Sequence, residues 1–185
     1  VEPNYEGCLK NQIYYDIMIQ RTKDYVDDAI EAGLYVIIDW HVHTDPAPYV
    51  NEAIAFFDEM SQLYGDYPNV LWEICNEPSG ASATWENIKT YAHQVIPVIR
   101  ANDPDNVIIV GTPTWSQDVD VASQSPLTGY TNIMYAFHFY AADHTYKYRI
   151  KLLTAINNNL PIFCTEWGTS GYNPVTTPPD FFQSQ

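Results

Sequence analysis

Two glutamates, Glu77 and Glu166, stand at the ends of apolar segments and are the residues best suited to acid–base chemistry. Glu77 closes the segment VLWEICNE, and Glu166 closes the segment LPIFCTE. Two carboxyl groups can divide catalytic work when one is protonated and the other is ionised. Held about 5–5.5 Å apart, such a pair can cleave a glycosidic bond with retention of configuration. The fold must therefore bring these two segment ends together.

Polar side chains also end two further apolar segments. Asp39 and His41 share one face of the first segment, and His138 and Tyr140 share one face of the fourth, because side chains alternate along a strand. In a parallel barrel the catalytic groups sit at the C-terminal ends of the strands, above a packed interior. Four segments that end alike therefore predict one shared polar site.

Two carboxylates, Asp39 and Glu73, fall on the same inner faces but deeper in the predicted barrel. A buried carboxylate without a partner costs several kcal/mol. None of the predicted strands contains a Lys or an Arg. We therefore expect the donors to come from His41 or from a strand outside this sequence.

The apolar segments alternate with amphipathic stretches along the chain. The expected strands span residues 34–41, 70–77, 106–112, 133–140 and 160–166, and the expected helices span 13–32, 49–64, 84–100 and 145–158. Thr84 is the expected N-cap of the third helix, and Gly33 takes the C′ position after the first. Pro97 is expected to end or kink the third helix.

Strands separated by helices of this length predict parallel βαβ units. No glycine-rich phosphate-binding fingerprint follows any of the strands, which disfavours a dinucleotide-binding sheet. The predicted fold class is therefore α/β, a (β/α)₈ TIM barrel. A complete barrel takes about 250 residues, so residues 1–185 are interpreted as a single partial catalytic domain with about strands 3 to 7. We expect the chain to be cut at both ends.

The charge of the chain limits its partners. The sequence has 23 Asp+Glu against 8 Lys+Arg, a formal net charge of −15. Nucleic acids and anionic membrane surfaces need basic patches, so both are disfavoured as partners, and a neutral substrate is favoured. No apolar run has the length of a membrane span, and the N-terminal residues do not resemble a signal peptide.

The three cysteines, Cys8, Cys75 and Cys164, show no metal-binding or redox spacing. Their odd number leaves at least one thiol without an intramolecular disulfide. Cys75 and Cys164 each lie two residues before one of the two glutamates, and we interpret them as small apolar packing groups.

Two short motifs carry a family resemblance. The sequence NEP at residues 76–78 and the sequence TEWG at 165–168 resemble the two signature segments of glycoside hydrolase family 5, the cellulase family. VIIDWH, GTPTW and HFYA extend the match in the expected order, and the resemblance covers most of residues 29–170. It implies that Glu77 is the acid/base and Glu166 the nucleophile of a retaining hydrolase.

The resemblance also implies roles for five neighbouring residues. His41 and Asn76 would bind the sugar or the adjacent carboxylates at the cleavage subsite, with Asn76 on the 2-hydroxyl. His138 would support the catalytic pair, and Tyr140 would hydrogen-bond and orient the nucleophile. Trp115 would form an aromatic platform on the leaving-group side.

The expected substrate is a β-1,4-glucan, either cellulose or mixed-linkage glucan, and the alternatives are mannan and xyloglucan. The resemblance implies an extracellular enzyme that acts without a cofactor, and we expect a monomer. The family's strand-2 arginine and strand-8 aromatic residue fall outside this sequence. We therefore expect the isolated 185 residues to be poorly stable and weakly active, because open barrel edges expose apolar strand surface.

Two other classes of function compete with this interpretation. In a metal-dependent hydrolase, His41 and His43 would bind Zn²⁺ with His138 as a third ligand. In a carbohydrate-binding or inactive barrel, the aromatic and acidic residues would hold a glycan without cleaving it. No later strand places an Asp ligand within reach of the histidines, which disfavours the metal site. The intact glutamate pair favours catalysis over glycan binding for the parent protein, and for the isolated fragment both alternatives stay open.

Overall fold

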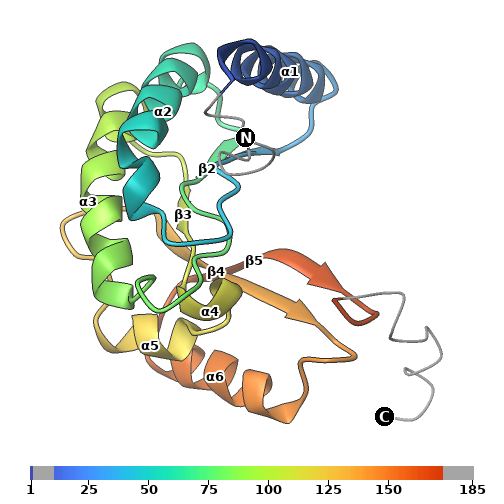
Figure 1. The fold of residues 1–185 in the computed structure, drawn as a ribbon, viewed down its shortest axis with the longest axis vertical. Coiled ribbons are helices and arrows are strands. Elements are labelled where there is room, and N and C mark those ends of the chain that lie inside the picture. The colour runs from blue at the N-terminus through green and yellow to red at the C-terminus, as the bar shows by residue number, and fades with distance from the viewer. Residues whose placement is uncertain (2–10, 173–185) are drawn as a thin grey trace.

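Five parallel strands form one curled sheet in the computed structural model, which describes residue 1 and residues 11–172 (Figure 1). The sheet order follows the chain, β1-β2-β3-β4-β5, and every neighbouring pair is parallel. The strands are β1 Val36–Asp39, β2 Val70–Glu73, β3 Ile108–Val110, β4 Ile133–Tyr140 and β5 Ile162–Gly168. The five predicted strands are all present, and the α/β fold class is confirmed.

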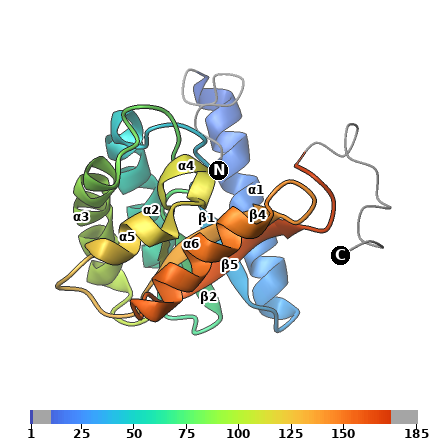
Figure 2. The same cartoon turned by 90° about the horizontal axis from the view of Figure 1, so that it is seen from below.

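The longer helices connect the strands and cover the outer side of the sheet, as the view in Figure 2 shows. The helical elements are α1 Gln12–Glu31, the 3₁₀ turn η2 Ala47–Tyr49, α2 Val50–Tyr64, α3 Trp85–Asn102, α4 Pro113–Ser116, α5 Val119–Gln124 and α6 Tyr146–Asn157. The short helices α4 and α5 were not predicted, because six residues or fewer give no readable helical period. The arrangement is a half-barrel with the helices outside.

The main core lies between the sheet and α2 and α3. Trp40 packs on Phe56 with ring centroids 5.3 Å apart, and Phe57 meets Trp72 edge-on at 6.3 Å. All four rings are fully buried. Trp40 thus packs against α2 rather than into the barrel. This core fixes the backs of β1 and β2.

The helix ends follow the predicted signals with one exception. The hydroxyl of Thr84 accepts a hydrogen bond from the Asn87 amide at 3.3 Å, as an N-cap should. Gly33 has φ +70°, and the N–H of Leu34 donates back to the Ala29 carbonyl at 2.9 Å, which closes a Schellman motif. Of the two outcomes expected at Pro97, an end or a kink, the end does not occur, because α3 continues to Asn102.

Strands β1 and β2 end earlier than predicted, at Asp39 and Glu73 instead of His41 and Glu77. Parallel backbone bonding nevertheless continues beyond both ends. The Asn76 amide donates to the Trp40 carbonyl at 3.2 Å, and the Glu77 amide donates to the Val42 carbonyl at 2.9 Å. Glu77 is thus held by the sheet although it lies outside the strand.

Strand β5 carries a bulge against β4. Tyr135 pairs with Ile162 and Ala136 with Phe163, but His138 pairs with Glu166, so β5 has one extra residue between these pairs. A bulge of this kind breaks strict alternation. Thr165 therefore turns into the barrel, against the predicted face, while Glu166 still reaches the cavity as predicted.

The described residues contain no helix long and apolar enough to cross a membrane. Cys75 is buried as expected, and Cys164 is half-buried. Cys8 lies outside the described residues.

Candidate active site

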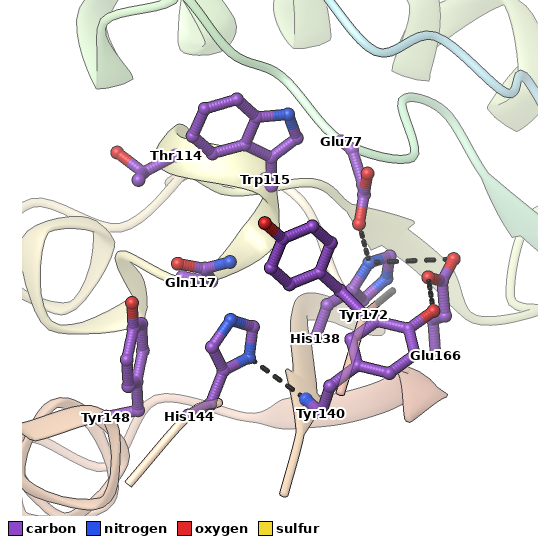
Figure 3. A pocket seen from close by; sticks show the side chains of 10 residues that line it. All are labelled: Glu77, Thr114, Trp115, Gln117, His138, Tyr140, His144, Tyr148, Glu166 and Tyr172. Carbon is purple, nitrogen blue, oxygen red and sulfur yellow. Dashed lines mark hydrogen bonds and ion pairs between the residues drawn. The ribbon is translucent and has the colours of Figure 1, made fainter. Parts of the chain in front are cut away.

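A cavity of about 640 Å³ opens at the C-terminal ends of the strands (Figure 3). It is lined by Glu77, Thr114, Trp115, Gln117, His138, Tyr140, His144, Tyr148, Glu166 and Tyr172. Five of the seven predicted site residues are in this list, and only His41 and Asn76 are not. Of the four segment ends expected to meet, those carrying Glu77, His138 and Tyr140, and Glu166 do meet, and the one carrying His41 does not.

Glu77 and Glu166 face each other across His138 (Figure 3). One carboxylate oxygen of each glutamate and one nitrogen of His138 all lie within 4.8 Å of one another. The Nδ1 atom of His138 is 2.9 Å from Oε1 of Glu77 and 3.9 Å from Oε2 of Glu166. His138 is almost fully buried at 1% exposure, whereas the Glu166 side chain is 34% exposed. The histidine therefore forms the floor between two carboxyl groups that reach the cavity.

Tyr140 holds the second glutamate. Its hydroxyl donates to Oε1 of Glu166 at 2.5 Å, and this hydrogen bond, with burial, raises the pKa of Tyr140 to about 12. The phenol thus remains a donor throughout the neutral range. Gly168 makes room for the ring, because a Cβ there would lie 2.7 Å from Cδ1 of Tyr140.

His144 ties Tyr140 to helix α6. The backbone N–H of Tyr140 donates to Nδ1 of His144 at 2.9 Å, so the remaining proton of a neutral His144 is on Nε2. Burial lowers the pKa of His144, and its ring lies against Tyr148 with centroids 4.3 Å apart. Sequence reasoning missed His144, Tyr148, Gln117 and Tyr172, because they come from turns and helix starts rather than from strand ends.

Trp115 overhangs the cavity from an unusual turn. Thr114, Trp115 and Ser116 are three consecutive residues with φ between 55° and 59°, a left-handed conformation that costs about 1–2 kcal/mol per residue. The Ser116 hydroxyl anchors the turn by donating to the Asn76 carbonyl at 2.6 Å. The Trp115 side chain is 49% exposed, as a platform for a ligand would be.

Asn76 and His41 lie beside the cavity rather than in its wall. Asn76 is buried, and its side-chain Nδ2 has no hydrogen-bond partner among the described residues. His41 lines a separate hollow next to β1, where its Nδ1 is 2.6 Å from Oδ2 of Asp39. The expectation that His41 supplies a partner for Asp39 is thus confirmed.

The second deep carboxylate, Glu73, is satisfied from β5 instead. Asp39 and Glu73 pair in register on β1 and β2, and Glu73 is only 4% exposed. The Thr165 hydroxyl donates to Oε1 of Glu73 at 2.7 Å. Burial and the nearby Asp39 charge raise the pKa of Glu73 well above its ordinary value. This contact depends on the bulge in β5 and was not predicted.

The arrangement can place an acid and a nucleophile on either side of a bound group. Among the described residues, the group of three or more possible metal ligands is Glu77, His138 and Glu166. The competing metal-site hypothesis needed His41 and His43 beside His138, and the structure does not gather these three. His43 instead faces the first glutamate, with Nε2 3.9 Å from Oε2 of Glu77.

A half-barrel of parallel strands with two carboxyl groups at its mouth defines a class of glycosidase-like (β/α)₈ proteins. The model of the cellulase family, glycosyl hydrolase family 5, matches residues 3–180. The chain therefore belongs to glycosyl hydrolase family 5.

Curated relatives and solved structures agree with this family. The chain is 54% identical over 154 residues to endoglucanase A of Evansella cellulosilytica and 52% identical over 145 residues to endoglucanase Z of Dickeya dadantii. These matches cover 82% and 78% of this chain but only 31% and 33% of the relatives. The chain thus spans about a third of their length.

The catalytic domain of a Thermobifida fusca endoglucanase has the same fold, with a TM-score of 0.82 and 41% identity over 92% of this chain and 57% of that one. A variant of that domain, in complex with cellotetraose, gives a TM-score of 0.83 and 40% identity. The cellulase Cel5C_n gives a TM-score of 0.78 and 48% identity, covering 83% of this chain and 50% of that one.

Proposed function

We propose that the full-length protein is a retaining endo-β-1,4-glucanase that hydrolyses cellulose or mixed-linkage β-glucan. The observation that carries this proposal is the approach of Glu77 and Glu166, with one oxygen of each within 4.8 Å at a common cavity. Inverting glycosidases separate their carboxyl groups by about 6.5–9.5 Å to admit a water molecule, whereas retaining enzymes hold them about 5–5.5 Å apart. The short separation supports a double displacement.

In the first step Glu166 attacks the anomeric carbon while Glu77 protonates the departing glycosidic oxygen. In the second step the ionised Glu77 takes a proton from water, and the resulting hydroxide releases the sugar from Glu166. The hydrogen bond from Tyr140 occupies Oε1 of Glu166 and leaves Oε2 for the attack. His138 supports both carboxyl groups from below.

The surrounding residues bind the sugar chain. The Nδ2 donor of Asn76, which is buried beside the cavity and has no partner among the described residues, is assigned to a sugar hydroxyl next to Glu77. His41 acts indirectly by fixing Asp39. The exposed indole of Trp115 offers an apolar face on the leaving-group side. Tyr148 and Tyr172 line the same cavity and extend this surface.

A β-1,4-glucan is the substrate class that the comparisons favour over mannan and xyloglucan. The relatives named above are endoglucanases, and one structural neighbour is in complex with cellotetraose. A neutral glucan also suits a chain of net charge −15. We propose that the enzyme acts outside the cell on this polymer, as a monomer and without a cofactor.

The test is a reducing-sugar assay of the full-length protein on carboxymethylcellulose, mannan and xyloglucan, with Glu77→Gln and Glu166→Gln as variants. We expect activity on carboxymethylcellulose to exceed the others and to fall by about 10³-fold or more in each variant. NMR of the first product from a cello-oligosaccharide should show the β-anomer. An initial α-anomer, or full activity in either variant, would refute the proposal.

A further inference from the structure

One buried titratable group has no part in the reaction described above. Glu73 lies below the cavity floor on β2, outside the cavity lining, and its side chain is 5% exposed. The acidic side chains that act on it are Asp39 from β1, Glu77 beyond the end of β2 and Glu166 from β5. Burying a carboxyl group among other acidic side chains costs free energy. A functional role would explain why a glutamate occupies this position.

A chain of hydrogen bonds connects Glu73 to the proposed acid/base. Thr165 donates to Oε1 of Glu73 at 2.7 Å, and its oxygen is also 2.8 Å from Nε2 of His138. Nδ1 of His138 is 2.9 Å from Oε1 of Glu77. Three contacts of ordinary hydrogen-bond length thus join the two glutamates through one hydroxyl and one imidazole.

The directions of these hydrogen bonds are linked. A threonine hydroxyl has a single hydrogen, and that of Thr165 is used on Glu73. Its oxygen must therefore accept from His138, so the proton of a neutral His138 lies on Nε2. The bare Nδ1 is then an acceptor, and the partner that can donate to it is the protonated carboxyl group of Glu77. In the opposite tautomer, Nδ1–H would donate to Glu77 and favour the ionised form.

We propose that Glu73 and Thr165 are positioning residues for the acid step: together they hold His138 in the Nε2–H tautomer that favours protonated Glu77. The inference rests on the proposed function, because it assigns Glu77 the role of proton donor. Burial raises the pKa of Glu73, and a Glu73 that carries its proton on Oε2 still accepts from Thr165 at Oε1, so the direction of the hydrogen-bond chain is kept.

The groups that face this chain come from several elements. His138 lies within 3.9 Å of Glu73 and of Glu166, and His43 reaches Glu77 from the segment after β1 at 3.9 Å. These neighbours are unchanged by a substitution at Thr165. A shift in the pH dependence of a Thr165 variant would therefore report the hydrogen-bond chain itself.

Two matched pairs of variants test the proposal in the full-length protein. Thr165→Val removes the hydroxyl at nearly constant volume, and Thr165→Ser keeps it. Glu73→Met removes the acceptor, and Glu73→Gln keeps a carbonyl oxygen in its place. The measurement is kcat/KM against pH on carboxymethylcellulose and on an aryl β-cellobioside whose phenol leaves without protonation.

We expect Thr165→Val and Glu73→Met to lower kcat/KM on carboxymethylcellulose by about 10-fold or more, within the range of general acid catalysis. The alkaline limb of their pH profiles should move to lower pH, because Nδ1–H can then stabilise ionised Glu77. The loss on the aryl cellobioside should be less than about threefold, since that substrate needs little acid assistance. Thr165→Ser and Glu73→Gln should keep the wild-type profile.

Equal losses on the two substrates, or an unmoved alkaline limb in folded Thr165→Val, would overturn the inference and leave a packing role. A Thr165→Ser variant as impaired as Thr165→Val would do the same. Glu77→Gln separates this failure from that of the proposed function. If Glu77→Gln remains active on carboxymethylcellulose, the proposed function itself fails, whatever the Thr165 variants show.

Discussion

The first and last strand pairs of the sheet, β1–β2 and β4–β5, both place polar side chains inside the barrel, one by regular pairing and the other by a bulge. The β1–β2 pair is regular over all its residues and sets two carboxylates side by side, Asp39 against Glu73. The β4–β5 pair is interrupted by a bulge, and the extra residue lets Thr165 point inward to Glu73. The bulged pair thus supplies the hydrogen-bond donor for a carboxyl group that the regular pair buries.

The comparison shows that the regular pair gives structural support and that the bulged pair carries most of the site residues. The regular pair is supported from behind by the aromatic core of α2 and supplies rigid backbone. The bulged pair carries His138, Tyr140 and Glu166, which line the cavity, while Thr165, next to Glu166, points to Glu73. Bulges beside active sites commonly re-aim a side chain in this way.

The largest expected effect concerns the segment that follows β2, in the regular strand pair. A Cβ at Gly111, just after β3, would lie 2.1 Å from the Cys75 carbonyl oxygen and 2.7 Å from Cδ of Pro78. Both contacts are with the segment that holds Glu77 and cannot move without shifting the sheet. We expect Gly111→Ala to lower the free energy of unfolding by about 3 kcal/mol or more, measured by urea denaturation. A loss below about 1 kcal/mol would show that this segment adapts.

The next effect tests the bulged side through Tyr140. Tyr140→Phe removes the 2.5 Å hydrogen bond to Glu166, and a bond to a charged group contributes about 1.5–3 kcal/mol. We expect kcat/KM on carboxymethylcellulose to fall about 10-fold or more, with little change in stability.

Tyr140 should not set the pH dependence. Its pKa of about 12 keeps the hydroxyl protonated across the working range, so the alkaline limb of the rate profile should be the same in wild type and in Tyr140→Phe. A limb that disappears in the variant would assign that limb to the phenol.

A smaller effect is expected at Gly168, where an added Cβ would clash with a side chain instead of with the backbone. A Cβ at Gly168 would meet only the ring of Tyr140, at 2.7 Å, and a ring can rotate where a carbonyl cannot. We expect Gly168→Ala to lower the free energy of unfolding by about 1–2 kcal/mol, less than Gly111→Ala, while lowering activity as much as Tyr140→Phe. Loss of stability equal to that of Gly111→Ala would remove the contrast between the two strand pairs.

The smallest effect is a pH slope in stability. Because burial and Asp39 raise the pKa of Glu73 in the folded state, the folded protein binds this proton more tightly than the unfolded chain. The contribution is complete below the ordinary carboxyl pKa of about 4.3 and is lost as pH rises through the raised folded value. The stability of Glu73→Gln relative to wild type should therefore increase with pH, in urea titrations at several pH values. A flat difference for Glu73→Gln would contradict the raised pKa.

The sequence alone could predict the half-barrel and the residues that meet at its mouth. Alternation placed His138 and Tyr140 correctly along β4, and it placed Glu77 correctly because parallel backbone bonding continues past the end of β2. The inward direction of Thr165 could not be predicted, because a bulge is set by how two strands pair and not by either strand's own pattern. His144 was missed for a similar reason, since a turn that follows a strand has no period.

The left-handed turn that carries Trp115 has a consequence for protein engineering. Three residues in succession are in a conformation that glycine would adopt with less strain, and the Ser116 hydroxyl anchors them to the backbone beside Glu77. A library screened for heat resistance alone would favour glycine at Thr114. The same change would make the position of the Trp115 indole over the cavity less fixed. Selection for thermal tolerance and selection for polymer turnover would therefore favour different residues in this turn.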